Sequence, residues 1–225
     1  MRWVDHPDRG FQVTGGRGSI GSLHMNRNSA AAFVSIAMLA ASGPVPARAA
    51  EPTAAQRMSE AGPERQSLEK QTGTWDVVAS IWPAPGAEPI VSHGIVAERK
   101  MIGSILQETM HPGPGSQTPA FTRLDYLDFD RVEGRWKYVS MDTRFPVSIM
   151  PAASFGPAED GRIDVHFTPQ GFVGFGPEVE GRFMVSDMAI SNPDADHALK
   201  EQHVLMADGT GKSWLFVRYE YTRRH

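Results

Sequence analysis

The feature that most constrains the fold is a series of short segments in which apolar and polar residues alternate. It runs from Thr74 to the end of the chain, and turns rich in Gly, Pro, Asn and Asp separate the segments. Alternation with a period of two is typical of β-strands that bury one face. About nine or ten segments occur, at the spacing of an all-β barrel or sandwich. Because strands and helices do not alternate, a parallel sheet or a dinucleotide-binding fold is disfavoured.

The spacing predicts an antiparallel up-and-down β-barrel with a short N-terminal helix that partly plugs its mouth. The helix is predicted over 63–70, since Pro63 stands in its first turn and Gly73 follows its end. The predicted strands cover residues 74–82, 90–100, 102–110, 120–130, 135–144, 162–168, 181–190, 198–207 and 213–224. The apolar but Gly- and Pro-rich stretches 146–157 and 168–177 fit either irregular strands that pack on the core or a hydrophobic rim at the barrel mouth.

Residues 25–49 have the three parts of a secretory signal peptide. Arg27 gives a positive start, 30–41 form an apolar stretch, and Ala47 and Ala49 fit the small-x-small cleavage pattern. The apolar stretch has 12 residues, whereas a membrane-spanning helix needs about 20. We therefore predict cleavage after Ala49, no integral membrane segment in the mature chain, and a periplasmic or secreted location.

The remaining boundaries follow from this prediction. Residues 1–24 are interpreted as a mis-assigned or disordered N-terminal extension, with Met25 as the initiator. Residues 50–66 form a polar leader, and 67–225 form the barrel domain. Loss of residues 1–49 would remove five Arg and two Asp, and would change the net charge from −4 to −7. A moderately acidic chain without a basic run disfavours nucleic acid and anionic membranes as partners. The absence of cysteine excludes disulfides and thiolate chemistry.

Four stretches resemble the bacterial family known as domain of unknown function 1579. They read LEKQTGTWDVVASIW, GSILQE, LDYLDFDRVEGRWKYVSMDTR and DGTGKSWLFVRYEYTRR, and the resemblance spans residues 67–224. It implies a lipocalin-like (calycin-type) barrel and no particular activity.

The Gly73-Thr74-Trp75 sequence is also similar to the opening of lipocalins and nitrobindin-like barrels. This likeness implies that Trp75 packs across the barrel floor, under an Arg of the last strand, for which Arg223 and Arg224 are the candidates. Nitrobindin-like proteins bind haem through a His near the end of the chain. Since 213–224 contains no His, we predict neither haem nor another cofactor.

The candidate ligand site combines aromatic and charged residues on one strand face. In 135–144 that face carries Trp136, Tyr138, Ser140, Asp142 and Arg144, and in 102–110 the matching polar residue is Glu108. The predicted ligand-binding residues are Glu108, Trp136, Tyr138, Asp142 and Arg144. An alternative is that Asp142 and Arg144 form a structural ion pair with each other or with Glu108. In the last strand both faces are bulky, so alternation does not decide which one lies inside.

Motifs for catalysis and metal binding are lacking. The sequence has no HxH or HExxH spacing, and Ser154 lacks a Gly-x-Ser-x-Gly context. We therefore predict no metal site and assign no catalytic residue.

Three hypotheses of function remain. The first is a protein that binds a small, largely apolar ligand in the barrel. The second is a hydrolase or isomerase with Asp142 or Glu108 as general base, which requires a raised carboxyl pKa. The third is a cell-envelope interaction module with a filled barrel. An open interior with an unpaired carboxylate would favour the enzyme, and a filled interior would favour the module.

Overall fold

The computed structural model describes residues 53–59, 62–145, 149–171 and 179–225. The chain divides into two compact units, 1–48 and 49–225, and all described residues belong to the second. The predicted signal peptide and the extension before it lie outside the described residues.

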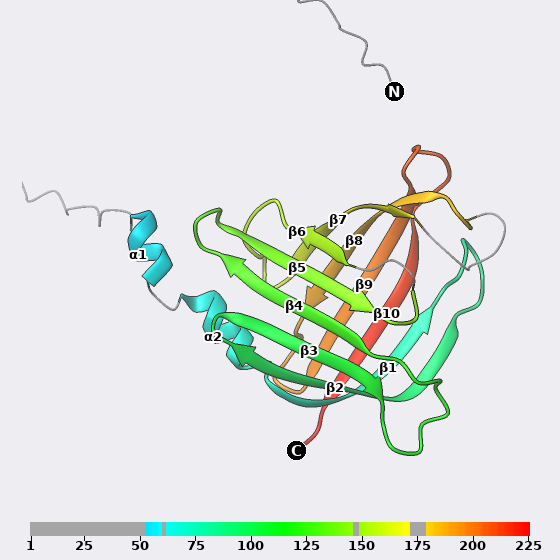
Figure 1. The fold of residues 1–225 in the computed structure, drawn as a ribbon, viewed down its shortest axis with the longest axis horizontal. Coiled ribbons are helices and arrows are strands. Elements are labelled where there is room, and N and C mark those ends of the chain that lie inside the picture. The colour runs from blue at the N-terminus through cyan, green and yellow to red at the C-terminus, as the bar shows by residue number, and fades with distance from the viewer. Residues whose placement is uncertain (1–52, 60–61, 146–148, 172–178) are drawn as a thin grey trace, which may run out of the picture. The chain divides into compact units, whose positions relative to one another are not determined.

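Ten antiparallel strands close into a barrel in the described part of the chain (Figure 1). Each strand pairs with its neighbour in sequence, and β1 pairs with β10 to close the ring. This confirms the predicted all-β up-and-down barrel. The elements are α1 (Ala54–Ser59), α2 (Pro63–Glu69), β1 (Gly73–Ile81), β2 (Ile90–Ile102), β3 (Ile105–Pro112), β4 (Arg123–Asp130), β5 (Arg135–Asp142), β6 (Met150–Ala153), β7 (Ile163–Gly171), β8 (Phe183–Ser191), β9 (His197–Met206) and β10 (Trp214–Arg223).

Every second residue points into the barrel, as the alternation predicts. In β5 the buried residues are Trp136, Tyr138, Ser140 and Asp142, and in β3 they are Leu106, Glu108 and Met110. The buried apolar side chains form two clusters, one that includes Trp75 and one that includes Leu68.

A register shift explains why both faces of the last strand are bulky. The pairing of β10 with β9 shifts between Leu215 and Val217. Before the shift Trp214 and Phe216 are buried, and after it Val217, Tyr219 and Tyr221 are buried. A β-bulge adds one residue to a strand and so moves the inward face to the other parity. Both parities of β10 therefore contribute to the core.

The short helix α2 lies at the end of the barrel where β1 begins and contacts β2, β3 and β4 (Figure 1). Its buried residue is Leu68, which joins the second core cluster. A second helix, α1, was not predicted within the polar leader. Its sequence signal is a capping box: the backbone N–H of Thr53 donates to Gln56 Oε1 (2.8 Å), and that of Gln56 donates to Thr53 Oγ1 (3.3 Å).

One other local prediction differs from the structure. The strand expected over 102–110 begins only at Ile105, because Gly103, with φ of 63°, provides a tight turn after β2. The apolar stretch 146–157 contains β6, which pairs with β5 and β7 and fits the alternative of an irregular strand that packs on the core, whereas residues 172–177 of the second such stretch lie outside the described residues. Met150 of β6 is buried, whereas Phe155 beyond it is 88% exposed. Among the described helices, none has the length and apolar character needed to cross a bilayer.

Candidate functional site

A row of polar side chains crosses one wall of the barrel interior. Arg99 of β2 pairs in register with Glu108 of β3, Glu108 with Asp125 of β4, and Asp125 with Ser140 of β5. Residues that pair directly across antiparallel strands lie on the same face, so one inward residue fixes the orientation of the others. The pairing of the strands therefore places all four side chains on the inner face of the barrel.

Lys200 of β9 meets this row from the other side of the ring, since β9 is separated from β3 by three strands in one direction and five in the other. Its Nζ donates to Glu108 Oε1 and to Asp125 Oδ2, both at 2.8 Å. The Nε of Arg99 donates to Glu108 Oε2 (2.6 Å). The hydroxyl of Tyr221 also donates to Glu108 Oε1 (3.1 Å). Each carboxylate thus has at least one cationic partner within hydrogen-bonding distance.

The row of polar side chains and Lys200 together form a charged cluster. A second layer of this cluster, built around Arg123, extends towards the end of the barrel away from α2. Arg123 donates through Nε to Asp125 (3.0 Å), through Nη1 to the hydroxyl of Tyr219 (2.7 Å), and through Nη2 to that of Tyr138 (3.2 Å). Its register partner on β5 is Asp142, at 3.9 Å from Nη1. Arg123 therefore links the inner carboxylates to Asp142.

Arg144 ends the cluster just beyond the last residue of β5. It donates to both carboxylate oxygens of Asp142, from Nε at 3.0 Å and from Nη2 at 2.6 Å. The guanidinium also stacks on the ring of Phe121, 3.9 Å from its centroid. The Asp142 side chain is fully buried, whereas 23% of the Arg144 side chain is exposed. Arg144 thus connects the buried cluster to solvent.

Glu108, Asp125 and Lys200 keep their charges at neutral pH. Burial alone would raise the pKa of the Glu108 carboxyl, but the charges of Lys200 and Arg99 outweigh it and hold that pKa below its usual value. The same balance, with Arg123 and Lys200 as the cations, lowers the pKa of Asp125. Burial acts the other way on Lys200, where the two carboxylates raise the pKa well above its usual value.

The two tyrosines beside these carboxylates remain neutral. Burial and the charge of Asp125 raise the pKa of Tyr138, and burial and the charge of Glu108 raise the pKa of Tyr221. The Glu108 and Asp125 carboxylates are therefore ionised, and the Tyr138 and Tyr221 phenols are protonated.

Of the five predicted site residues, four belong to this cluster. Glu108, Tyr138, Asp142 and Arg144 are joined through Arg123, Asp125 and Lys200. Trp136 also points inward but lies in the apolar cluster that includes Leu68, with its ring 5.2 Å from that of Phe129. Asp142 and Arg144 pair with each other, and Glu108 pairs with Arg99 and Lys200 instead.

Sequence reasoning missed four members of the cluster: Arg99, Arg123, Asp125 and Lys200. The sequence contains a signal for each of them, because each is a charged residue at a strand position whose side chain the alternation places inside the barrel. Lys200, for example, shares its face with Ala198, Gln202 and Val204. Alternation marks such a residue as inward, but it does not give the partner on the far wall.

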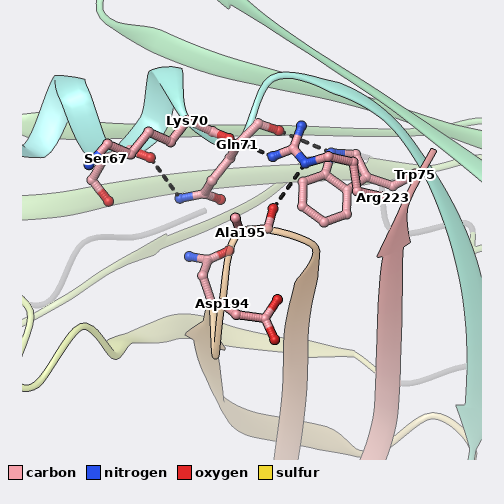
Figure 2. A pocket seen from close by; sticks show the side chains of 8 residues that line it. Ser67, Lys70, Gln71, Trp75, Asp194, Ala195 and Arg223 are labelled. Atoms are coloured by element: carbon pink, nitrogen blue, oxygen red, sulfur yellow. Dashed lines mark hydrogen bonds between the residues drawn. The ribbon is translucent and has the colours of Figure 1, made fainter. Parts of the chain in front are cut away.

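Two of the spaces at the α2 end of the barrel are lined by Gln71. An outer pocket of about 520 Å³ is formed by the end of α2, the β8–β9 turn and Arg223 (Figure 2). An inner cavity of about 10 Å³ lies against the charged cluster, with Arg99, Glu108, Asp125 and Lys200 in its wall. A cavity of that size has room for about one water molecule. The interior around Glu108 is therefore nearly filled by protein.

The described residues contain no group of three or more His, Asp or Glu side chains arranged to hold a metal ion. The charged and hydroxyl side chains of the site can bind a partner through charge and hydrogen bonds.

Fold and site together define the class: a closed, ten-stranded antiparallel barrel with a charged cluster in its interior. The family model described as "Protein of unknown function (DUF1579)" matches residues 60–223, and the chain belongs to this family. The resemblance noted in the sequence is thereby confirmed.

Among solved structures, the chain is similar to one titled "Crystal Structure of Rv2717c from M. tuberculosis", with 13% sequence identity and a TM-score of 0.47. The alignment covers 74% of this chain and 100% of that chain. Similarity at this level carries no information about a ligand or an activity. A comparison with curated proteins gave no match.

Proposed function

We propose that this protein is an exported barrel that binds a small, largely apolar molecule with an acidic or polar head group, and that Arg144 anchors the head group. The observation that carries the proposal is the charge of the cluster. Among the described residues it joins four cations to three carboxylates: Arg99, Arg123, Arg144 and Lys200 with Glu108, Asp125 and Asp142. One positive charge is left over.

The excess charge lies in the layer away from α2. Arg99 and Lys200 are balanced by Glu108 and Asp125, which leaves Arg123 and Arg144 against Asp142. An acidic head group beside Arg144 would neutralise this layer. The stack on Phe121 holds the guanidinium in place, and such preorganisation reduces the entropy lost on binding.

The enzyme hypothesis receives less support. A general base works best when its pKa lies near the working pH, whereas Lys200 and Arg99 lower the pKa of Glu108 after burial is accounted for. Glu108 is also saturated with donors from Arg99, Lys200 and Tyr221. These features suit a structural carboxylate.

One observation favours a second candidate, the envelope interaction module with a filled barrel. The cavity beside Glu108 has a volume of about 10 Å³, too small for an organic ligand at that depth. In this case the cluster would serve to fix the strand register, a role that buried ionic groups are known to have in some proteins.

Binding of a matched pair of probes separates the two candidates. Decanoate and decanol have the same chain length and differ in the charge of the head group. The binding proposal expects decanoate to bind more tightly, and Arg144→Ala to weaken decanoate binding by about 1.5–3 kcal/mol, the value of a hydrogen bond to a charged group. Arg162→Ala is the control, because Arg162 is an exposed arginine paired with Asp164 on the outer surface.

Native mass spectrometry of protein purified gently from its host gives an independent reading. A retained small molecule that is lost in Arg144→Ala would support binding. Protein that carries nothing, binds neither probe, and unfolds when Arg144 is removed would support the filled-barrel module.

A further inference from the structure

The sequence contains two Asp-Gly pairs, Asp160-Gly161 and Asp208-Gly209. In such a pair the aspartate side chain can react with the backbone nitrogen of the glycine, which has no side chain of its own to hinder the approach. Both pairs lie in exposed turns, so exposure does not distinguish them. Their hydrogen bonds differ, and this difference makes one pair reactive and the other protected.

The first pair forms the tip of a two-residue hairpin in the connection between β6 and β7 (Figure 1). Glu159 and Arg162 flank the tip and exchange two backbone hydrogen bonds, at 3.1 and 2.8 Å. Asp160 and Gly161 both have a positive φ, of 49° and 77°. Positive φ at both central residues is the conformation of a type I′ turn.

Both reacting groups of this turn are free of hydrogen bonds within the described part of the chain. The Asp160 carboxylate has no donor or cation as a partner there, and the backbone N–H of Gly161 has no acceptor. The carboxyl group can therefore turn towards the nitrogen without breaking an interaction.

The same two groups are held in the second pair. Oδ1 of Asp208 accepts from the backbone N–H of Thr210 (2.9 Å) and from its hydroxyl (2.6 Å), and Oδ2 accepts from Arg182 Nη2 (2.7 Å). The backbone N–H of Gly209 donates to the carbonyl oxygen of Met206 (2.9 Å). A reaction at Asp208 would have to break several of these bonds first.

The protonation of the Asp208 carboxyl adds to its protection. The reaction expels a carboxyl oxygen as water, so it requires the neutral acid. Hydrogen bonds from Thr210, with a further contribution from Arg182, lower the pKa of Asp208 to about 2. At mildly acidic pH this carboxyl is therefore almost completely ionised.

We propose that Asp160 is a site of spontaneous isomerisation to isoaspartate, and that its hydrogen bonds protect Asp208 from the same change. The backbone nitrogen of Gly161 attacks the side-chain carboxyl carbon of Asp160. A C–N bond forms, the N–H proton and the hydroxyl leave as water, and a cyclic succinimide results. Water then adds to either carbonyl of the ring. Addition at the main-chain carbonyl breaks its bond to nitrogen and leaves the chain connected through the side chain. The water lost is regained, and nothing is oxidised or reduced.

The product changes the hairpin that contains it. Isoaspartate adds one carbon atom to the main chain between Glu159 and Arg162. The length of a hairpin loop determines how its flanking residues pair, so the added atom breaks the two hydrogen bonds between these residues. Because the product accumulates, the fraction of molecules with an opened hairpin grows with the age of the protein.

Incubation of the folded protein in H₂¹⁸O at mildly acidic pH tests the proposal. Each passage through the succinimide inserts one ¹⁸O atom into the residue that forms. After digestion in ordinary water, mass spectrometry of the two Asp-Gly peptides gives the rate at each site, and electron-transfer fragmentation identifies isoaspartate. We expect uptake at Asp160 to be about tenfold faster than at Asp208 or more, since one hydrogen bond to a charged group is equivalent to a factor of about ten.

Unfolded protein and two variants serve as controls. In urea both pairs should react at similar rates, because the contacts that distinguish them are lost. Asp160→Glu would have to form a larger ring, so uptake at this position should stop while uptake at Asp208 is unchanged. Thr210→Ala removes the hydroxyl that donates to Asp208 and should raise uptake there several-fold in the folded protein, but not in urea.

Equal rates at the two sites of the folded protein would overturn the proposal. So would uptake at Asp160 that occurs in urea and is absent from the folded barrel. An unchanged rate at Asp208 in folded Thr210→Ala would show that its hydrogen bonds do not protect it.

Discussion

The guanidinium of Arg223 lies over the ring of Trp75, with its central carbon 4.2 Å from the ring centroid. A second guanidinium, that of Arg99, lies 4.8 Å from the same centroid. Trp75 and Arg223 are also register partners on β1 and β10, at the seam that closes the barrel. Gly73 leaves room for this arrangement: its φ is 120°, and a Cβ there would lie 3.1 Å from Arg223 Nη1. The Gly-x-Trp sequence is thus explained by backbone conformation and close approach.

Replacement of Trp75 by Ala should lower the free energy of unfolding by about 3–5 kcal/mol, because it empties a large buried aromatic site. Trp75 is 1% exposed and also donates to the Gln71 carbonyl. Urea unfolding followed by circular dichroism measures the change. A loss below about 1 kcal/mol would be typical of a surface position and would contradict the packing described for Trp75.

Arg223 and Arg224 form a matched pair for a second prediction. Arg223→Ala removes donors to three carbonyl oxygens that join α2, the β8–β9 turn and β1, and should cost about 1.5–3 kcal/mol. Arg224→Ala breaks an exposed ion pair with Asp76 and should have a smaller effect. Thermal unfolding of the two variants measures the difference. Equal unfolding midpoints would show that Arg223 does not hold α2 in place.

Lys200→Met should destabilise the barrel by about 3–5 kcal/mol, since it leaves two buried carboxylates without their shared cation. The triple variant Lys200→Met, Glu108→Gln, Asp125→Asn also removes the carboxylates that accept from Arg99 and Arg123, so it leaves two buried guanidiniums without these partners and should be less stable still. Chemical denaturation of the two variants measures the difference. A triple variant at least as stable as Lys200→Met would show that Arg99 and Arg123 do not depend on these carboxylates.

Stability should fall at both ends of the pH scale. The folded-state pKa values of Glu108 and Asp125 are lowered, so their contribution is full above the unfolded pKa of about 4 and is lost as the pH falls further. The folded-state pKa values of Tyr138 and Tyr221 are raised. Their contribution is therefore full below about pH 10 and is lost above it.

Denaturation at a series of pH values tests this dependence, with tyrosinate absorbance as a second signal. Tyr138 and Tyr221 should ionise together with unfolding. Ionisation of both while the barrel is still folded would contradict their position beside buried carboxylates.

The strand pattern was predictable because it depends on local alternation and on turn residues. The inward faces of β3 and β5 were assigned correctly from parity, and Arg223 fills the role that the lipocalin likeness gave to one of two arginines. The bulge between Leu215 and Val217 was not predictable in this way, because a shift of register is visible only against the neighbouring strand.

The charged cluster was only partly predictable, because contacts across a barrel depend on strand number and stagger. Parity places Lys200 inside, but only the closed ring brings it to Glu108 and Asp125. The depth of a side chain along the barrel axis could not be predicted from the sequence either. Trp136 and Asp142 share a face of β5, yet one packs in an apolar cluster and the other joins the ions.

The seam between β1 and β10 has a consequence for the order of events during folding. β1 finds one partner, β2, early in the chain, whereas its other partner is the final strand. Until β10 is available, β1 and β9 each have an unpaired edge, and such edges can pair with other chains. Contacts between distant parts of a sequence also slow folding. A chaperone that holds the nascent chain until β10 has emerged would therefore protect it during the period of greatest risk of aggregation.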